Sequence, residues 1–197
     1  MWSNLNIRNK ILSVISIAFI LITVFAITEL KSVGGAISHW KSIQSNELMS
    51  VATGLEFKKQ VQEWKNVLLR GSDPAQNKKY WDKFQAQQDA TQSKVDELIV
   101  GLAQFPTQLE KAKAFKVAHQ KMGDAYATGK KKFDDSNFDS AAGDAAVKGI
   151  DRAPTDLLQT ISDELYEIAH SSSNSIIVDM NATIIKDAGL LLVTSLI

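Results

Sequence analysis

Two arginines are the residues in this chain best suited to hold a small anion. Arg70 comes directly before a Gly-Ser-Asp-Pro turn at residues 71–74, and Arg152 lies in the segment Gly-Ile-Asp-Arg-Ala-Pro. A planar guanidinium donates two parallel hydrogen bonds to a carboxylate or a similar group. Arginines also stabilise the C-terminus of a helix, as Arg70 would, or pair with local acids, as Arg152 would with Asp151 or Asp156. A ligand site and a structural role are both open for the two arginines.

Three aromatic residues close to Arg70 in the sequence could wall a pocket between helices. Trp64 precedes Arg70 by less than two helical turns, and Tyr80 and Trp81 follow the turn at 71–74. Small-molecule sites are lined mostly by apolar and aromatic side chains. Aromatic residues on the seam of a helix are more often part of the core, so both interpretations stay open. The candidate ligand-binding residues are Arg70, Arg152, Trp64, Tyr80 and Trp81.

The sequence contains no catalytic motif. Phosphate-binding glycine loops, nucleophile elbows and zinc-protease motifs are absent, and the chain has no cysteine. His119 and His170 occupy similar depths on two predicted helices, which a bis-histidine haem or metal site would require. No further ligand pattern accompanies them, and a buried, hydrogen-bonded histidine is the commoner case. We therefore expect no enzymatic activity, no metal site and no cofactor.

Helix start and stop signals divide the middle of the chain into four helices. Gly71 suits the position after a helix, Asp73 suits an N-cap and Pro74 suits the first position of the next helix. Pro106 ends the second helix, and residues 107–110 have the pattern of a capping box for the third. A short Ala-rich piece follows the third helix, and the fourth then opens near a proline.

The spacing of apolar residues predicts how these helices pack. In the second and third helices apolar positions alternate between three and four residues apart. This stripe is typical of antiparallel helices with left-handed packing. The expected fold class is therefore all-α, an antiparallel four-helix bundle with transmembrane helices at both ends.

Two apolar runs predict the transmembrane helices. Residues 11–28 carry no charge and are long enough to cross a bilayer as a helix, and a second run occupies residues 188–197. Arg8 and Lys10 precede the first run, which favours a cytoplasmic N-terminus. The expected segments are a cytoplasmic N-terminus at 1–10, a transmembrane helix at 11–29, a periplasmic sensing bundle at 30–186 and the start of a second transmembrane helix at 187–197.

The charge balance argues against nucleic acid as a partner. Lysine plus arginine and aspartate plus glutamate number 22 each, so the net charge is +0. A neutral chain has no overall field that would attract a polyanion. The lipid bilayer and a small molecule are the partners that the pattern of segments indicates.

Two segments of the chain resemble the periplasmic sensory domain of bacterial methyl-accepting chemotaxis proteins. They are VQEWKNVLLRGSDPAQNKKYW from Val61 and VKGIDRAPTDLL from Val147, and the opening LNIRNKIL is similar to the start of many such receptors. The resemblance implies a homodimeric four-helix bundle held in the bacterial inner membrane. It also implies a second span, a HAMP linker and a cytoplasmic signalling hairpin beyond Ile197.

The resemblance implies a receptor that detects a periplasmic small molecule, anionic if the arginines hold it. Its last helix would carry a displacement across the membrane to cytoplasmic signalling partners. Two other classes stay open. Similar bundles also form the sensor region of transmembrane diguanylate cyclases and histidine kinases, and a two-span adaptor without a catalytic partner is a structural alternative.

Overall fold

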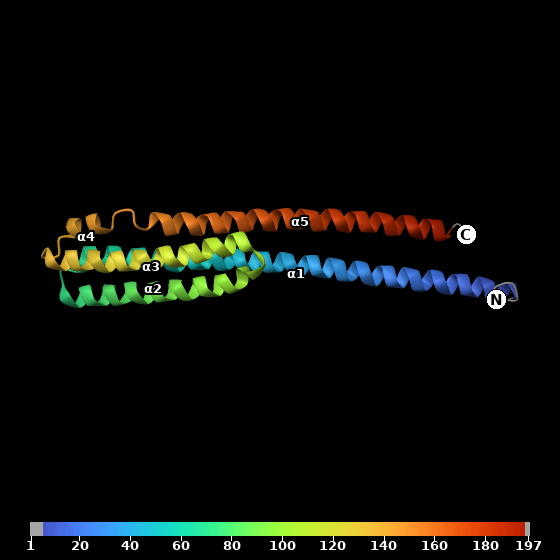
Figure 1. Cartoon of the computed structure of the whole chain (residues 1–197), viewed down its shortest axis with the longest axis horizontal. Helices are drawn as coiled ribbons and strands as arrows, with labels where there is room; N and C mark the ends of the chain where they lie inside the picture. The colour runs from blue at the N-terminus through green and yellow to red at the C-terminus, as the bar shows by residue number, and fades with distance from the viewer. Residues whose placement is uncertain (1–5, 196–197) are drawn as a thin grey trace. The chain divides into compact units, whose positions relative to one another are not determined.

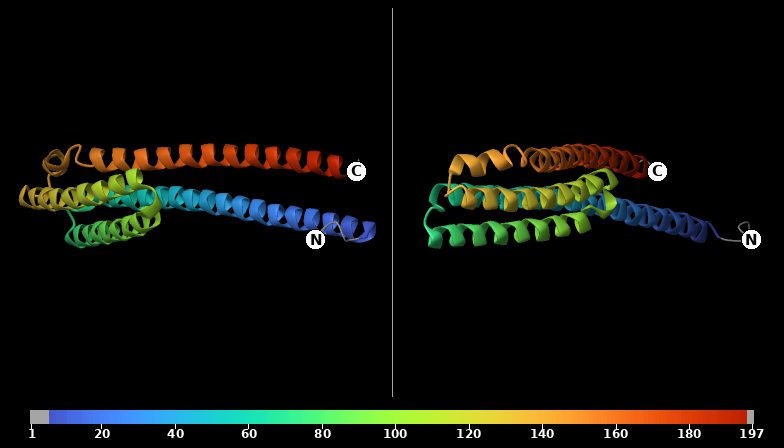
Figure 2. Two further views of the ribbon diagram at one scale, coloured as in Figure 1. Left: turned by 45° about the vertical axis from the view of Figure 1, so that its right-hand side comes forward. Right: turned by 60° about the vertical axis from the view of Figure 1, so that its left-hand side comes forward.

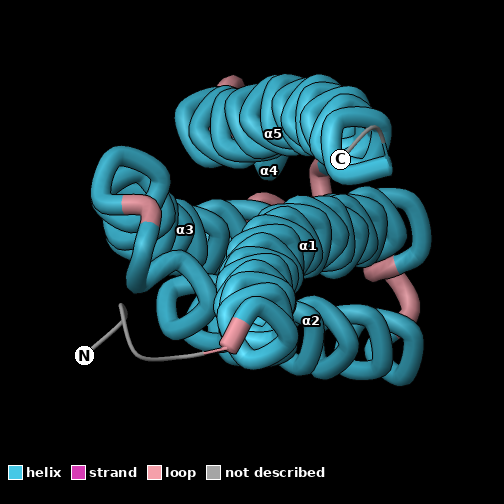
Figure 3. The backbone as a smooth tube through the Cα atoms, turned by 90° about the vertical axis from the view of Figure 1, so that its right-hand side faces the viewer, coloured by secondary structure: helices cyan, strands magenta, loops and turns pink. Residues whose placement is uncertain are grey.

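The computed structural model describes residues 6–195, with side chains described as far as residue 186. Within that range every regular element is helical, as Figure 3 shows, so the predicted all-α fold class is confirmed. The α-helices are α1 (Ile7–Arg70), α2 (Pro74–Gly101), α3 (Pro106–Asp135), α4 (Ser140–Val147) and α5 (Arg152–Ser195), and a short 3-10 helix, η2 (Leu102–Gln104), follows α2.

The described chain forms two compact units. The first, which we call the core unit, is Ser42–His170. The second combines the described residues of 1–41 and 171–197. Both α1 and α5 contribute residues to each unit.

One hydrophobic core holds the core unit together. In Figures 1 and 2, α2 and α3 lie alongside the C-terminal part of α1, with α4 and the beginning of α5 next to them. Phe84, Phe115 and Phe133 are fully buried at 0% exposure. Burying one such side chain stabilises the fold by about 1.5–3 kcal/mol. The residues of this core come from all five α-helices, so the core joins them into one unit.

The turn between α1 and α2 forms as its residues predict. Oδ1 of Asp73 accepts hydrogen bonds from the backbone N–H groups of Ala75 (2.8 Å) and Gln76 (2.9 Å), and Pro74 opens α2. Gly71 is buried, and a Cβ atom there would lie 2.3 Å from the carbonyl oxygen of Val67. Only glycine fits at that point of the turn.

The start of α3 differs from the prediction. Pro106 is the first residue of α3, and its N-cap residue, Phe105, makes no side-chain cap hydrogen bond. The predicted capping box at 107–110 is therefore wrong. Proline suits the first position of a helix because its missing N–H would have no partner there, and this places Thr107 inside the first turn.

Among the described residues the structure has five α-helices where the sequence predicted four and a short piece. The Ala-rich piece forms the separate helix α4, with Asp139 as its N-cap (2.9 Å to the N–H of Ala141). Gly143 lets α4 approach α1 and α3, because a Cβ atom there would lie 2.6 Å from Leu68 and 3.0 Å from Phe133.

The N-terminal part of α1 is apolar and exposed. It contains an 18-residue window with a mean hydropathy of 2.7 and 0% of its residues buried, so by length and composition it could cross a membrane. Residues 1–5 of the predicted cytoplasmic segment lie outside the described residues. The predicted second span at 187–197 lies where side chains are not described, and it stays a prediction, although the backbone of α5 continues to Ser195.

Candidate functional site

Arg70 and Tyr80 meet across the turn that joins α1 and α2. Nη1 of Arg70 donates a hydrogen bond to the hydroxyl oxygen of Tyr80, and its Cζ lies 5.3 Å from the centroid of the Tyr80 ring. Tyr80 is only 7% exposed, whereas Arg70 is exposed. The guanidinium is thus held in place by a neutral group, and its charge is not neutralised by that contact.

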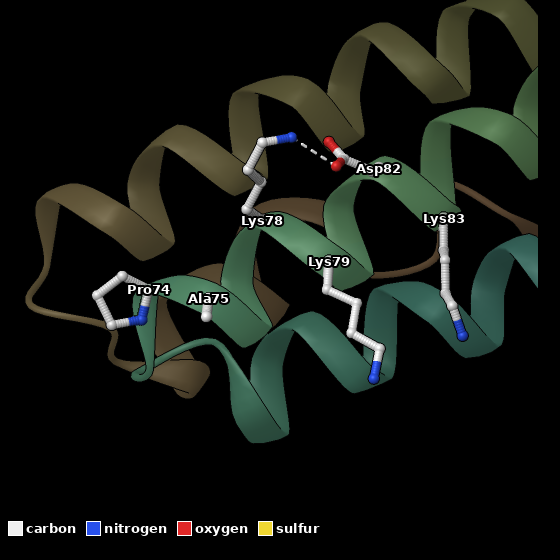
Figure 4. A pocket seen from close by; sticks show the side chains of 6 residues that line it. All are labelled: Pro74, Ala75, Lys78, Lys79, Asp82 and Lys83. Carbon is white, nitrogen blue, oxygen red and sulfur yellow. Dashed lines mark hydrogen bonds and ion pairs between the residues drawn. The ribbon is translucent and has the colours of Figure 1, made fainter.

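Two lysines of α2 approach the same ring. Nζ of Lys79 lies 5.4 Å and Nζ of Lys83 lies 5.6 Å from the Tyr80 centroid. Figure 4 shows both lysines extending to the same side of α2, while Lys78 turns to Asp82, 2.6 Å away. We call Arg70, Lys79 and Lys83 the cation cluster. Within the described part of the chain, no ion pair joins these three cations to a carboxylate.

Lys79 and Lys83 of the cation cluster, but not Arg70, line an open recess of about 660 Å³. Figure 4 shows the residues that line it. Its lining residues are Pro74, Ala75, Lys78, Lys79, Asp82 and Lys83. The first N–H groups of α2 are already used by Asp73, so an anion in this recess would be held by side chains. Sequence reasoning missed Lys79 and Lys83, although two lysines one turn apart around Tyr80 were a readable signal.

The two tryptophans differ in their surroundings. Trp64 is 3% exposed and packs edge-on against Tyr126 (centroids 5.2 Å apart), so it belongs to the core. Its indole N–H is buried and has no hydrogen-bond partner among the described residues. Trp81 is half-buried and stacks on Phe84 at 4.9 Å, with Nζ of Lys130 5.8 Å from its ring. Of these two candidate residues, only Trp81 is partly exposed.

Arg152 makes no described contact with the other four candidates. It is the exposed first residue of α5, and its N–H donates to the carbonyl oxygen of Gly149 (3.3 Å). Across the described residues, no hydrogen bond or ring contact joins Arg152 to Arg70, Tyr80 or the tryptophans. The structure therefore brings Arg70 and Tyr80 together and does not add Arg152 to them.

His119 is a buried core histidine. Its Nδ1 lies 2.8 Å from Nε2 of Gln92, and its Nε2 lies 2.6 Å from Oε1 of Gln60. Burial lowers the pKa of His119 from 6.5 to about 4. Both ring nitrogens are thus engaged by amides, while His170 stacks on Tyr166 at 6.3 Å. The described residues contain no group of three or more His, Cys, Asp or Glu side chains placed to hold a metal ion.

The core unit and its exposed cations define an all-helical domain with a candidate anion site. No protein-family model matches the chain, and no solved structure matches it. Methyl-accepting chemotaxis protein CtpH of Pseudomonas aeruginosa is 38% identical to it over 142 residues, which are 72% of this chain. The chain is therefore related to the methyl-accepting chemotaxis proteins, and the resemblance seen in its sequence is confirmed. The match covers 25% of the length of that relative.

Proposed function

We propose that this chain is the sensory region of a transmembrane chemoreceptor and is not itself an enzyme. The observation that carries the proposal is the 38% identity to a methyl-accepting chemotaxis protein. The exposed apolar part of α1, with a mean hydropathy of 2.7, supports a place in a bacterial inner membrane. This relative favours a chemoreceptor over the sensor of a diguanylate cyclase or a histidine kinase.

The proposed architecture follows from the helical core unit and the apolar runs. Residues 30–186 form a periplasmic antiparallel four-helix bundle to which α4 is added, and the bundle assembles as a homodimer. Residues 11–29 and the run from residue 187 onward cross the membrane. Residues 1–10 lie in the cytoplasm.

The proposed ligand is a small anion from the periplasm. The exposed guanidinium of Arg70, held by Tyr80, supports this choice because a charge-assisted hydrogen bond to arginine is stronger than a neutral one. Trp81 offers a half-buried ring nearby on α2. In this proposal Arg152 joins the site only after a rearrangement, because it makes no contact with Tyr80 in the described chain. Trp64 is buried in the core and would reach the ligand only if the core rearranged as well.

The proposed signal is a displacement of α5 that reaches cytoplasmic partners. The unbroken course of α5 from Arg152 to Ser195 supports this route. A ligand shifts two signalling states only by its different affinity for them. The ligand must therefore contact a group whose position differs between the two states.

A thermal-shift screen of amino and organic acids tests the receptor proposal. The chain is held in lipid nanodiscs, and each hit is measured again by calorimetry. We expect at least one small acid to raise the unfolding temperature, because a ligand that binds only the folded state stabilises it. If amino acids, organic acids, sugars and amines all leave the unfolding temperature unchanged, the proposal of a small-molecule receptor is wrong.

A further inference from the structure

We propose that the cation cluster of Arg70, Lys79 and Lys83 binds a small oxyanion that carries at least two negative charges. This inference rests on the proposed function, which asks for a small anion, and adds that the anion carries at least two negative charges. It also moves the centre of the site to the N-terminal turns of α2, where sequence reasoning had placed no cation.

The geometry brings three cations to one aromatic ring from two helices. Arg70 is the last residue of α1, and Lys79 and Lys83 lie one turn apart on α2. Their charged groups lie 5.3, 5.4 and 5.6 Å from the Tyr80 centroid. Because Tyr80 is 7% exposed, packing fixes the position of the ring that all three charged groups approach.

The charge of this cluster is not balanced inside the described chain. Several other lysines of the core unit pair with a carboxylate; Lys78 binds Asp82 and Lys94 binds Glu97. No such pair is formed by Arg70, Lys79 or Lys83 with any described residue. Like charges one turn apart on a helix repel each other. Cation–π attraction to Tyr80 offsets part of that repulsion but leaves the positive charge in place.

The number of cations sets the charge of the anion. A monovalent acid would neutralise one of the three cations and leave two facing each other. We expect a divalent or trivalent oxyanion to bridge two or three of them, because all three charged groups lie within 5.6 Å of one ring centroid, and each charge-assisted contact adds to its affinity. The recess of about 660 Å³ beside Lys79 and Lys83 has room for a small molecule. Asp82 does not oppose such an anion, since Lys78 already offsets its charge at 2.6 Å.

The exposure of the site predicts how the affinity responds to salt. Arg70, Lys79 and Lys83 are all exposed, so their interaction with an anion is screened by dissolved ions. A multivalent anion held by charge loses affinity steeply as salt rises, whereas a ligand held by apolar contacts does not.

Calorimetry on the full 197-residue chain in phosphatidylcholine nanodiscs tests the inference. The probes are propane-1,2,3-tricarboxylate, succinate, sulfate and acetate at constant ionic strength. We expect the affinity to rise about tenfold from acetate to succinate and again to the tricarboxylate, as one further charge contact forms each time. Sulfate tests whether the site recognises charge alone. If sulfate and succinate both bind tightly, the site recognises a divalent anion of any kind. If only the carboxylates bind, its ligand is an organic acid.

Matched lysine variants locate the site. Lys79→Gln and Lys83→Gln should each lower the affinity for the tightest multivalent probe about five- to tenfold, because each removes one charge contact. Lys113→Gln is the control, since it removes the same charge from an exposed lysine of α3 that pairs with Glu110. Circular dichroism of all three variants shows that the helices remain folded.

Each outcome decides the inference. Acetate binding as tightly as the tricarboxylate, or Lys79→Gln and Lys83→Gln binding like Lys113→Gln, would overturn it. If a monovalent or uncharged compound from the wider screen binds and depends on Arg70, the receptor proposal stands and the multivalent site is wrong. If no compound of any charge binds, both proposals are wrong.

Discussion

The imidazole Nε2 of His119 on α3 lies 2.6 Å from the side-chain oxygen of Gln60 on α1, in a fully buried contact. Gln92 of α2 approaches the other ring nitrogen at 2.8 Å. Phe57 and Phe115 pack on the ring, at 5.6 and 5.5 Å between centroids. The three helices are therefore joined by one polar layer inside an aromatic core. Since Nε2 of Gln92 donates to Nδ1, the hydrogen of the neutral ring is on Nε2 and points to Gln60.

This layer predicts that acid destabilises the core unit through His119. The pKa of His119 is about 4 in the folded chain because of burial, against 6.5 for a free histidine. Only the unfolded chain takes up a proton between these values, so the free energy of unfolding falls as pH drops from 6.5 towards 4. The loss from this group reaches about 2–3 kcal/mol near pH 4.5.

Urea unfolding of the chain and of His119→Gln, at about pH 7.5 and about pH 4.5, measures this effect. The variant should be less stable at the higher pH but lose about 2–3 kcal/mol less on acidification. An equal acid loss in the parent chain and in His119→Gln would contradict this assignment.

Replacing Arg70 with Ala should abolish binding of the anionic ligand and leave the helices folded. Loss of an exposed helix-end arginine costs at most about 1 kcal/mol of stability, whereas a lost charge contact to the ligand costs about 2–5 kcal/mol, or roughly 30-fold or more in affinity. Arg70→Lys keeps the charge but loses the planar fork, so we expect weak binding. Calorimetry that finds Arg70→Ala binding like the parent chain would make Arg70 structural.

Arg152→Ala tests whether the second arginine joins the site. The proposed function expects a loss of binding as large as that of Arg70→Ala, while the lack of a contact between Arg152 and Arg70 or Tyr80 in the described chain favours little change. Calorimetry with the ligand found in the screen decides between them. Normal affinity in Arg152→Ala would remove this residue from the site and leave the cation cluster as its centre.

Cysteine labelling should place residue 8 and α4 on opposite sides of the membrane. The chain has no cysteine, so single substitutions give an unambiguous signal. We expect Ser140→Cys to react with an impermeant maleimide in intact spheroplasts and Arg8→Cys to react only after lysis. Labelling of residue 8 alone in the intact spheroplasts would reverse the proposed topology.

An exposed apolar stripe on α1 should form the homodimer contact. Leu48, Val51 and Leu55 are 69%, 57% and 54% exposed within the core unit. We expect residues 31–185 to dimerise weakly, because part of the contact between chains is removed with the spans, and the ligand to strengthen the dimer. Val51→Lys should abolish it, and Val117→Lys on α3, where valine is 56% exposed, should not. Sedimentation velocity measures this, and a tight dimer without ligand would contradict the prediction.

A pair of glycine substitutions should show how closely α4 is packed. Gly143→Ala places a Cβ atom 2.6 Å from Leu68, so we expect a loss of about 1–3 kcal/mol. Gly54→Ala on α1 meets nothing within 4 Å and should stabilise the helix by up to about 1 kcal/mol. Thermal unfolding of both variants measures the difference, and equal melting temperatures would mean that α4 does not press on α1 and α3.

The sequence by itself determined the helical fold class and the turn at Gly71, Asp73 and Pro74. These features depend on sterics and hydrogen bonds within a few residues, which local patterns report well. The apolar run at 11–28 is likewise a local feature, because its length and lack of charge are read directly from the sequence. The start of α3 was predicted wrongly because the sequence has two adjacent helix-start signals, Pro106 and the 107–110 pattern. In the structure Pro106 is the first residue of the helix.

Only the tertiary structure decided which of the candidate residues share a site. Arg70 and Tyr80 are ten residues apart and meet through a tight turn, whereas Arg152 reaches neither in the described chain. Gln60, the partner of His119, lies 59 residues away along the chain. Contacts between helices depend on how the helices pack and rotate against each other, and a single helix pattern shows which face is buried but not which side chain of another helix it meets.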